Sequence, residues 1–307
     1  MFIDSAIIVA SWAQSVPVRK NWGDKLNPVL INRLSGKPVV HEKAVLGWED
    51  RPVFKVVGSG LGGVRENDII WGMGFISSTA IPSQVPLSVT AVRGPKSRQR
   101  LLENNVSCPE VYGDPAILYP LTYTPKVDVR YEYGIIHHFR ENDAIPPAKI
   151  KNEKSVLYID VLGDINTFVD QILSCRVVVS SSLHGLICAH SYGVNALWMK
   201  ASDLPLGDDF KFFDYFSSIG YPDVDPVKID DQGFLMLGGH DASRFMPRID
   251  GDLLIEHCPF LSKTKKRDWQ RKRQRLASAG QRGTIFNADM PDTPARSGKI
   301  RMWLKGK

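Results

Sequence analysis

One stretch of the sequence, residues 156–179, limits the possible folds more than any other. An apolar run, Val156–Asp160, is followed by a helical pattern over Ile165–Cys175 and then by a second apolar run, Val177–Val179. Apolar runs without polar alternation are typical of parallel strands that are covered on both faces, and a helix between two such runs indicates a strand–helix–strand unit. The sequence therefore predicts layered α/β structure built on parallel sheets.

Comparable patterns recur through most of the chain. Further strands are predicted at Ala6–Ala10, Val53–Val57, Ile69–Trp71, Ser88–Val92, Ile135–Ile136 and Ala196–Met199, and further helices at Asp24–Leu34, Pro95–Asn104 and Leu186–Tyr192. The chain has 307 residues, 43% of them hydrophobic, which is enough material for about two domains. A Pro-rich stretch at residues 119–125 predicts the boundary between a Rossmann-like domain over 1–125 and a second one over 126–262, facing each other across a cleft.

Basic residues are concentrated at the C-terminal end. Residues 263–307 hold fourteen Lys or Arg against three Asp or Glu, so the rest of the chain is slightly acidic although the whole carries a net charge of +6. An acidic body argues against a broad nucleic-acid-binding face, because such a face needs cations spread across it. We expect a basic helix and then a disordered end in this segment.

The sequence carries no evident targeting or redox signal. Its apolar runs are too short to span a membrane, and the apolar start at Ala6–Ala10 lacks a basic leader, so the expected location is the cytoplasm. Four widely spaced cysteines form no C-x-x-C pair, which argues against a disulfide framework or a zinc knuckle. We interpret them as buried thiols.

The first candidate site is the sequence Asn21-Trp-Gly-Asp24, between the first predicted strand and helix. Gly23 permits a close approach of another group, and Asp24 can cap the helix. Its carboxylate would then lie at the C-terminal edge of the sheet, where open α/β sheets bind ligands. A helix cap without a catalytic task is the alternative interpretation.

A second candidate follows the predicted strand Ser88–Val92. Arg93 ends this strand just before the helix that starts near Pro95, and its planar guanidinium suits a carboxylate or a phosphate. An ordinary ion pair is the alternative.

The glycine-rich sequence Gly58–Gly63 is only superficially like a dinucleotide-binding loop, because it leaves no room for the required helix. We interpret it as a loop that allows close approach of a ligand or of the other domain.

The most informative sequence is Val177–Gly185. A buried strand ends in three serines, Ser181 and Ser182 among them, and His184 stands on the strand-to-helix turn, where Gly185 allows an unusual backbone angle. Histidine can act as a general acid near neutral pH, and hydroxyls and amides can hold an anion. A purely structural histidine and a serine nucleophile are the alternatives, and the missing G-x-S-x-G pattern disfavours the nucleophile.

Two weaker candidates complete the predicted site. His137 and His138 follow a strand and point to opposite sides, and we include His137 among the substrate-binding residues. Lys211 lies at the start of a further predicted helix, where acidic neighbours suit the N-terminus. The spacing of histidines and acids supports no metal site.

These motifs, in this order over residues 21–220, resemble those of polysaccharide pyruvyl transferases, and they are most similar to the exopolysaccharide members. The motifs are N-W-G-D at 21–24, A-V-R-G-P-K-S at 91–97, Y-G-D-P at 112–115, G-I-I-H-H at 134–138, S-S-L-H-G at 181–185 and K-F-F-D-Y at 211–215. The resemblance implies a GT-B-like fold, in which two Rossmann-like domains face the active site. It also implies transfer of the enolpyruvyl unit of phosphoenolpyruvate to two sugar hydroxyls as a cyclic ketal.

The resemblance suggests roles for the candidate residues. His184 is the expected general acid, Asp24 orients or deprotonates the attacking hydroxyl, and Arg93 binds the donor. The other expected substrate-binding residues are Asn21, Gly23, Ser181, Ser182, Gly185, His137 and Lys211. No cofactor is expected besides the donor substrate. Some relatives carry an arginine where this chain has Ser182, so either a second cationic clamp comes from Lys96, Arg98 or Lys211, or hydroxyls and amides hold the donor.

The resemblance also bears on partners. Exopolysaccharide members modify lipid-linked repeat units, which implies a lipid-linked saccharide acceptor and gives the basic tail with Trp269 a reason to lie against an anionic inner leaflet. Solvated disorder of that tail is the alternative. Two rival functions stay open: a nucleotide-sugar glycosyltransferase of the same architecture, and a non-catalytic sugar-binding protein. A hydrolase ranks last.

Overall fold

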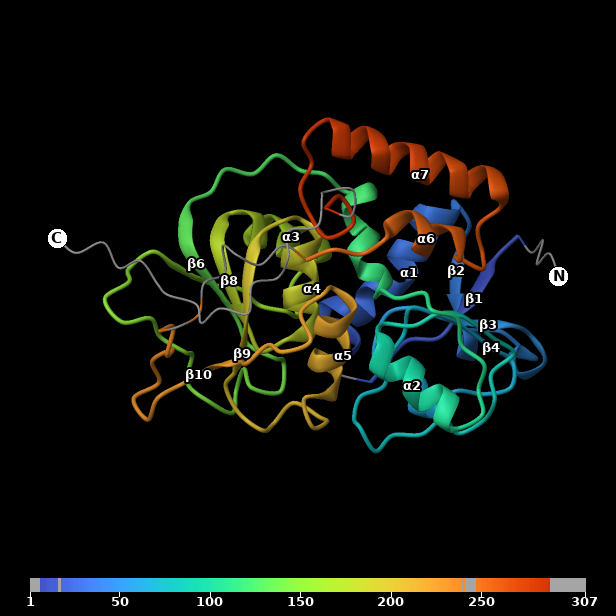
Figure 1. The fold of residues 1–307 in the computed structure, drawn as a ribbon, viewed down its shortest axis with the longest axis horizontal. Coiled ribbons are helices and arrows are strands. Elements are labelled where there is room, and N and C mark those ends of the chain that lie inside the picture. The colour runs from blue at the N-terminus through green and yellow to red at the C-terminus, as the bar shows by residue number, and fades with distance from the viewer. Residues whose placement is uncertain (1–5, 16–17, 239, 241–246, 288–307) are drawn as a thin grey trace.

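The computed structural model describes residues 6–15, 18–238, 240 and 247–287. Within these residues the strands form two sheets of five strands each, and every strand pairs with its neighbours in parallel. Figure 1 shows the two sheets with helices around and between them. The predicted α/β class with parallel sheets is confirmed.

The first sheet has the strand order β2-β1-β3-β4-β5. Its strands are β1 (Ile8–Ala10), β2 (Val39–His41), β3 (Val53–Lys55), β4 (Asp68–Trp71) and β5 (Ser88–Ala91). Helix α1 (Trp22–Ser35) follows β1, and helix α2 (Pro95–Glu103) follows β5. The glycine-rich loop after β3 forms only a short 3-10 turn at Leu61–Gly63, because β4 begins soon afterwards.

The second sheet has the strand order β10-β9-β8-β6-β7. Its strands are β6 (Tyr131–Ile136), β7 (Val156–Tyr158), β8 (Cys175–Ser180), β9 (Asn195–Lys200) and β10 (Val227–Lys228). Its helices are α3 (Ile165–Leu173), α4 (Leu183–Ser191) and α5 (Phe210–Ser218). A seven-residue 3-10 helix, η5 (Pro115–Leu121), precedes this unit.

The two sheets share one topology. When strands are numbered from the start of each unit, both sheets have the order 2-1-3-4-5. The order reverses between the first and third strands, which are β1 and β3 in one sheet and β6 and β8 in the other. Open α/β sheets bind ligands at the carboxyl ends of the strands beside this switch point. The segments that follow β1, β6 and β8 are therefore the first places to look for a site.

Most predicted elements are confirmed, with bounds that differ by a few residues. Strand β2 was missed because three residues after a helix give too little pattern, and β10 has only two residues. The strand expected over Val53–Val57 ends at Lys55, and Val56 and Val57 are buried as the chain leaves the sheet. The expected further helix near Lys211 is α5.

The helices of the two units pack against each other and share a core. Trp22 of α1 donates from its indole nitrogen to the carbonyl oxygen of Ile165 at 3.2 Å, and its ring lies 5.5 Å from the ring of Phe168 on α3. Trp22 and Phe168 are both fully buried in one apolar cluster that includes residues of both units. The carboxyl edge of one sheet is thereby held at a fixed position relative to the other.

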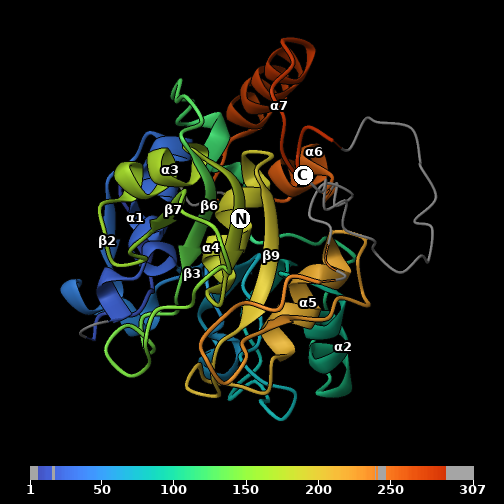
Figure 2. The ribbon, with the colours of Figure 1, turned by 90° about the vertical axis from the view of Figure 1, so that its left-hand side faces the viewer.

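The chain returns to the first unit after residue 249. Helices α6 (Gly251–Glu256) and α7 (Lys263–Ser278) lie on its side of the molecule in Figure 1, and Figure 2 shows α7 at the outer edge, above α6. The indole of Trp71 donates to Leu254 of α6 at 3.0 Å, and Phe260 packs edge-on against Trp71. Residues 251–262, placed in the second domain by the sequence, thus contact the first sheet.

Helix α7 confirms the basic helix expected from the sequence, but its tryptophan points inward. Trp269 donates from its indole nitrogen to the carbonyl oxygen of Leu34 on α1 at 2.9 Å, and Arg273 forms an ion pair with Asp252 at 2.7 Å. Trp269 is therefore not positioned to enter a lipid surface. The disorder expected after Gly280 is wrong for residues 281–287, where Ile285 and Phe286 are buried in the core, and the rest of that end lies outside the described residues.

Candidate active site

His184 stands at the point where the strand order of the second sheet reverses. Strand β8 ends at Ser180, Ser182 is the N-cap residue of α4, and His184 lies in the first turn of that helix. A Cβ atom on Gly185 would lie 2.4 Å from the hydroxyl oxygen of Ser180. Glycine is thus required by close packing, and the unusual backbone angle expected at Gly185 is wrong because the residue is helical.

The imidazole of His184 rests on the first unit. A Cβ atom on Gly23 would lie 2.1 Å from Nδ1 of His184, so only glycine leaves room for the ring. On the other side, Nε2 of His184 lies 3.6 Å from Oδ2 of Asp114. The side chain of His184 keeps 11% of its surface exposed, whereas Asp114 is fully buried. The close approach predicted for Gly23 is made by this catalytic candidate itself.

Asp24 faces the same imidazole from α1. Helix α1 begins at Trp22 with Asn21 as its N-cap residue, so the helix-cap role expected for Asp24 is wrong. Instead, the side-chain amide of Asn21 donates to Oδ2 of Asp24 at 2.8 Å. Burial raises the pKa of Asp24, although the amide of Asn21 and the positive form of His184 oppose this shift. Asn21 therefore orients a carboxylate that burial makes more basic.

The two adjacent histidines have different roles from those expected. Nε2 of His137 accepts a hydrogen bond from the amide of Ala148 at 3.0 Å, and its Nδ1 lies 3.6 Å from Glu141. His137 is buried among these groups and does not face the site. His138 is the histidine close enough to the site for the charges of Lys211 and His184 to act on its pKa. Burial, with Lys211 next in effect, lowers the pKa of His138 to about 3, so its ring is neutral.

Glu141 organises the loop that follows β6. Its buried carboxylate accepts hydrogen bonds from the hydroxyls of Ser181 and Ser202, the latter at 2.6 Å, and from the amide of His138 at 3.1 Å. The hydroxyl of Ser181 also accepts from the amide of His138 at 2.9 Å. Ser181, predicted to bind substrate, instead fixes the backbone of the neighbouring strand end.

Ser182 also has a backbone role. Its amide donates to the hydroxyl of Ser180 at 3.0 Å, and its carbonyl accepts from the same hydroxyl at 2.9 Å. The amide of Gly185 in turn donates to the carbonyl of Ser182 at 3.0 Å. Ser182 and Gly185 therefore shape the turn that presents His184.

Lys211 supplies a cation beside His138. Its ammonium group donates to the carbonyl of Leu206 at 3.3 Å, and the residue is 6% exposed. Burial, followed by the positive charge of Arg93, lowers the pKa of Lys211 to about 8. Arg140 lies within electrostatic range of both Lys211 and His138 and is itself exposed. Of the three residues named for a second clamp, Lys211 has this position, while Arg98 pairs with Glu110 at 3.2 Å.

Arg93 has no free face for a ligand. Its guanidinium is fully buried and donates to Asp214 at 3.0 Å, to the hydroxyl of Ser59 at 2.7 Å and to the carbonyl of Phe75 at 2.6 Å. Each of its three side-chain nitrogens therefore has a protein partner. The alternative of an ion pair describes Arg93 better than the expected donor clamp.

The ion pair of Arg93 joins the two units. Asp214 lies on α5 of the second unit, and it also accepts hydrogen bonds from the amide and the hydroxyl of Ser97 on α2, at 2.8 and 2.6 Å. A Cβ atom on Gly94 would lie 2.0 Å from the carbonyl oxygen of Asp214. The motifs at 91–97 and 211–215 are thus two halves of one structural joint.

Four residues around the site received no separate role from the sequence: Asp114, His138, Arg140 and Glu141. Asp114 stood inside a recognised motif, and His138 stood beside the histidine that was chosen. The roles of Asp114, His138 and Glu141 rest on contacts with residues forty or more positions away, such as the hydrogen bond between the amide of His138 and Ser181. No local spacing rule reveals such contacts.

Among the described residues the structure has neither a metal-binding cluster nor a membrane-spanning helix. Over the described ranges, no cluster of His, Cys, Asp and Glu has the arrangement that a metal ion would need. In that same part of the chain, no helix is both long and apolar enough to cross a bilayer.

Comparison with known proteins supports the family that these motifs suggest. The family model described as polysaccharide pyruvyl transferase matches residues 86–202. An uncharacterized protein, L143, from Acanthamoeba polyphaga mimivirus is 31% identical over 207 residues, which cover 65% of this chain and 71% of that protein. This chain belongs to the polysaccharide pyruvyl transferase family. No solved structure matches it significantly.

Membership of this family identifies the chain as a pyruvyltransferase and indicates transfer of a pyruvyl group to polysaccharide. The matched residues include Asp114, His138 and His184, but end before Lys211 and begin after Asp24. The contribution of α1 and α5 to the site is therefore supported by the structure and not by the family match.

Proposed function

We propose that this pyruvyl transferase uses phosphoenolpyruvate as donor and forms a cyclic ketal on two hydroxyls of a sugar. The observation that carries the proposal is the position of His184 between Asp24 and Asp114, in contact with Gly23 of the facing unit. Such a site between two α/β units is what a GT-B-like enzyme would use, and we propose that architecture here.

The donor would bind on the side of His138. Phosphoenolpyruvate is strongly anionic, and Lys211 and Arg140 are cations that surround this histidine. A neutral His138 can donate from Nε2, because its Nδ1 accepts from the amide of Arg140 at 3.3 Å. Arg93 contributes to this region only through its charge.

Ketal formation needs a proton at the methylene carbon of the donor. His184 would give that proton to C3, which leaves a positive centre at C2 to which the first sugar oxygen adds. The bond between C2 and the phosphate oxygen then breaks, and the second sugar oxygen adds to C2 in its place. One hydroxyl proton returns to His184, and the other leaves with inorganic phosphate. Asp24 would accept or orient the hydroxyl proton, since its raised pKa makes it a better base near neutral pH.

The test supplies phosphoenolpyruvate and a panel of oligosaccharides to the purified chain. We expect one molecule of phosphate released for each sugar that gains the mass of ketal-linked pyruvate. His184→Gln should lose both signals, whereas His257→Gln, at the end of α6, should keep them. Consumption of a nucleotide sugar in place of the donor would establish the glycosyltransferase alternative. Sugar binding without either reaction would establish a non-catalytic protein.

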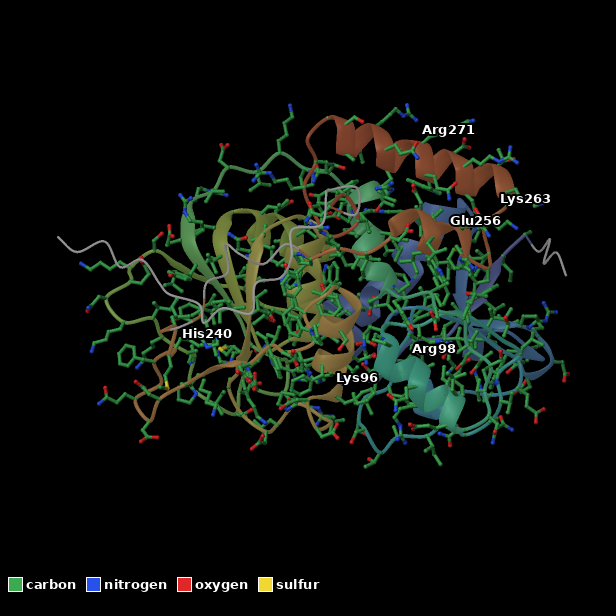
Figure 3. The ribbon with its side chains drawn as sticks, viewed as in Figure 1. Lys96, Arg98, His240, Glu256, Lys263 and Arg271 are labelled. Carbon is green, nitrogen blue, oxygen red and sulfur yellow. The ribbon has the colours of Figure 1, made fainter. Side chains whose placement is uncertain are left out.

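The acceptor we propose is lipid-linked, with the enzyme held near the inner leaflet by α7. The outward face of α7 is strongly basic, as Figure 3 shows for Lys263 and Arg271, while Trp269, Leu276 and Ala277 pack on the body. Contact with a membrane would therefore be electrostatic, at about 1 kcal/mol for each nearby cation.

Sedimentation with phosphatidylserine vesicles tests this contact. Reversing the charge of Lys263 and Arg271 should reduce binding at low salt, and added salt should weaken binding by the native chain. Reversing Lys126 and Lys228, which are equally exposed but lie on other parts of the molecule, is the matched control for net charge. Equal binding by all variants would end the membrane hypothesis.

A further inference from the structure

Two buried polar atoms face each other in the site without any hydrogen bond. Oδ2 of Asp114 and Nε2 of His184 are both sealed from solvent, and neither has a hydrogen-bond partner among the described residues. They lie 3.6 Å apart, close enough for an ion pair but longer than a hydrogen bond. Buried polar atoms left unpaired are costly, so this pair calls for a physical reason.

The carboxylate of Asp114 is held in place by its own surroundings. Its other oxygen, Oδ1, accepts from the amide of Ala116 at 3.0 Å and caps the 3-10 helix η5. The adjacent Pro115 fits against Gly72, where a Cβ atom would come within 2.2 Å of the proline ring. Because Oδ1 is committed to the cap and the turn is fixed, Oδ2 is constrained to face the imidazole.

The imidazole of His184 is constrained as well. Its Nδ1 edge lies over Gly23, and its ring lies 6.4 Å from the ring of Trp22. With Nε2 sealed against Asp114, Nδ1 is the ring nitrogen that remains for a ligand. The other ionisable groups near the ring are Asp24 on α1 and His138 after β6, and the latter is neutral.

We propose that Asp114 is a positioning residue for His184: its carboxylate accepts a hydrogen bond from the Nε2–H group and so reserves Nδ1 for proton transfer. This inference rests on the proposed function for its catalytic meaning. The long Nε2–Oδ2 separation would shorten to a hydrogen bond when a ligand fills the site, as is common for catalytic hydrogen bonds that are long in the empty enzyme. A buried carboxylate behind a histidine fixes its tautomer and stabilises its charged form.

Asp114→Asn separates this role from helix capping. The asparagine oxygen can keep the hydrogen bond from Ala116, while its amide hydrogens face Nε2 and force that nitrogen to become an acceptor. The matched control is Asp164→Asn. Asp164 caps α3 through the amides of Asn166 and Thr167, has an exposed side chain and has no imidazole opposite it.

The first measurement is the nitrogen NMR spectrum of histidine-labelled protein without substrate, with His184 assigned by loss of its signal in His184→Gln. We expect the neutral ring to carry its proton on Nε2 in the native chain and in Asp164→Asn, and on Nδ1 in Asp114→Asn. A native ring protonated mainly on Nδ1 would overturn the inference, and this reading requires no variant at position 114 to fold.

The second measurement is steady-state kinetics. Asp114→Asn should lower kcat on the order of 10²–10⁴-fold with little change in KM for phosphoenolpyruvate, because Asp114 does not touch the donor. Unchanged kcat together with an unchanged tautomer would refute the positioning role while leaving the proposed function intact. If the native chain transfers no pyruvate but Asp114→Asn still moves the proton of His184 from Nε2 to Nδ1, the proposed function fails and the positioning of His184 stands.

Discussion

The buried ion pair between Arg93 and Asp214 allows a test of whether Arg93 stabilises the contact between the two units or binds the donor. Replacing Arg93 by Met keeps an extended side chain of similar reach but removes the charge that Asp214 pairs with at 3.0 Å. Both side chains are fully buried, so solvent cannot take over from the lost partner. The substitution therefore changes the stability of the joint between the units before it changes anything at the donor site.

The expected loss of stability follows from what Asp214 retains. Removing one partner of a buried ion pair costs about 3–5 kcal/mol. Asp214 keeps the amide and hydroxyl of Ser97 at 2.8 and 2.6 Å, so we expect the lower end of this range, about 3 kcal/mol. At about 1.4 kcal/mol for each factor of ten, the folded-to-unfolded ratio falls roughly a hundredfold.

Urea unfolding at neutral pH measures this loss. The double variant Arg93→Met/Asp214→Asn should be no less stable than Arg93→Met alone, because it leaves no unpaired buried charge and an asparagine can keep hydrogen bonds to the amide and hydroxyl of Ser97. If Arg93 instead grips the donor, Arg93→Met will unfold within about 0.5 kcal/mol of the native chain. It will also lose the stabilisation that phosphoenolpyruvate gives to native protein, and that pair of results would refute the structural assignment.

Two further predictions concern the site itself. Gly23→Ala should displace the ring of His184, whose Nδ1 would lie 2.1 Å from the new Cβ, and lower kcat on the order of 10²-fold; Gly63→Ala, which meets no atom within 4 Å, should leave kcat unchanged. A full-rate Gly23→Ala would show that the ring position is not needed. Because the pKa of Lys211 is lowered to about 8, its charge is present below that pH and lost above it, so KM for phosphoenolpyruvate should rise as pH increases through 8. Lys211→Arg should remove this rise, since a guanidinium stays charged, and an identical rise in the variant would assign it to another group.

The layered fold could be predicted because its signal is local. Apolar runs such as the one that forms β8 are complete within six residues, and helix α3 comes just before it in the same short stretch of sequence. Strand β2 and helix α6 were missed because each is too short to show a period. The packing of Trp269 against α1 was missed for another reason: a basic helix with few apolar residues has the sequence pattern of a solvent-exposed helix.

The choice between His137 and His138 shows where local reasoning ends. In a strand with one buried face, alternation tells which of two neighbours points inward. Strand β6 is a central parallel strand between β7 and β8, and its last three residues are all buried, so its sequence gives no such alternation. The decision depends on Glu141 and Ala148, which hold His137 on one side and leave His138 to face Lys211.

Arg93 was assigned the right location and the wrong partner for a related reason. Its residue type and its position at the end of a strand predict an anion nearby, and the anion present is Asp214, 121 residues away in the sequence. The joint still influences the site, because the fixed charge of Arg93 lowers the pKa of Lys211. A motif arginine can therefore matter for donor binding without touching the donor: it holds α5 in place and adds to the effect of burial in lowering the pKa of the neighbouring lysine.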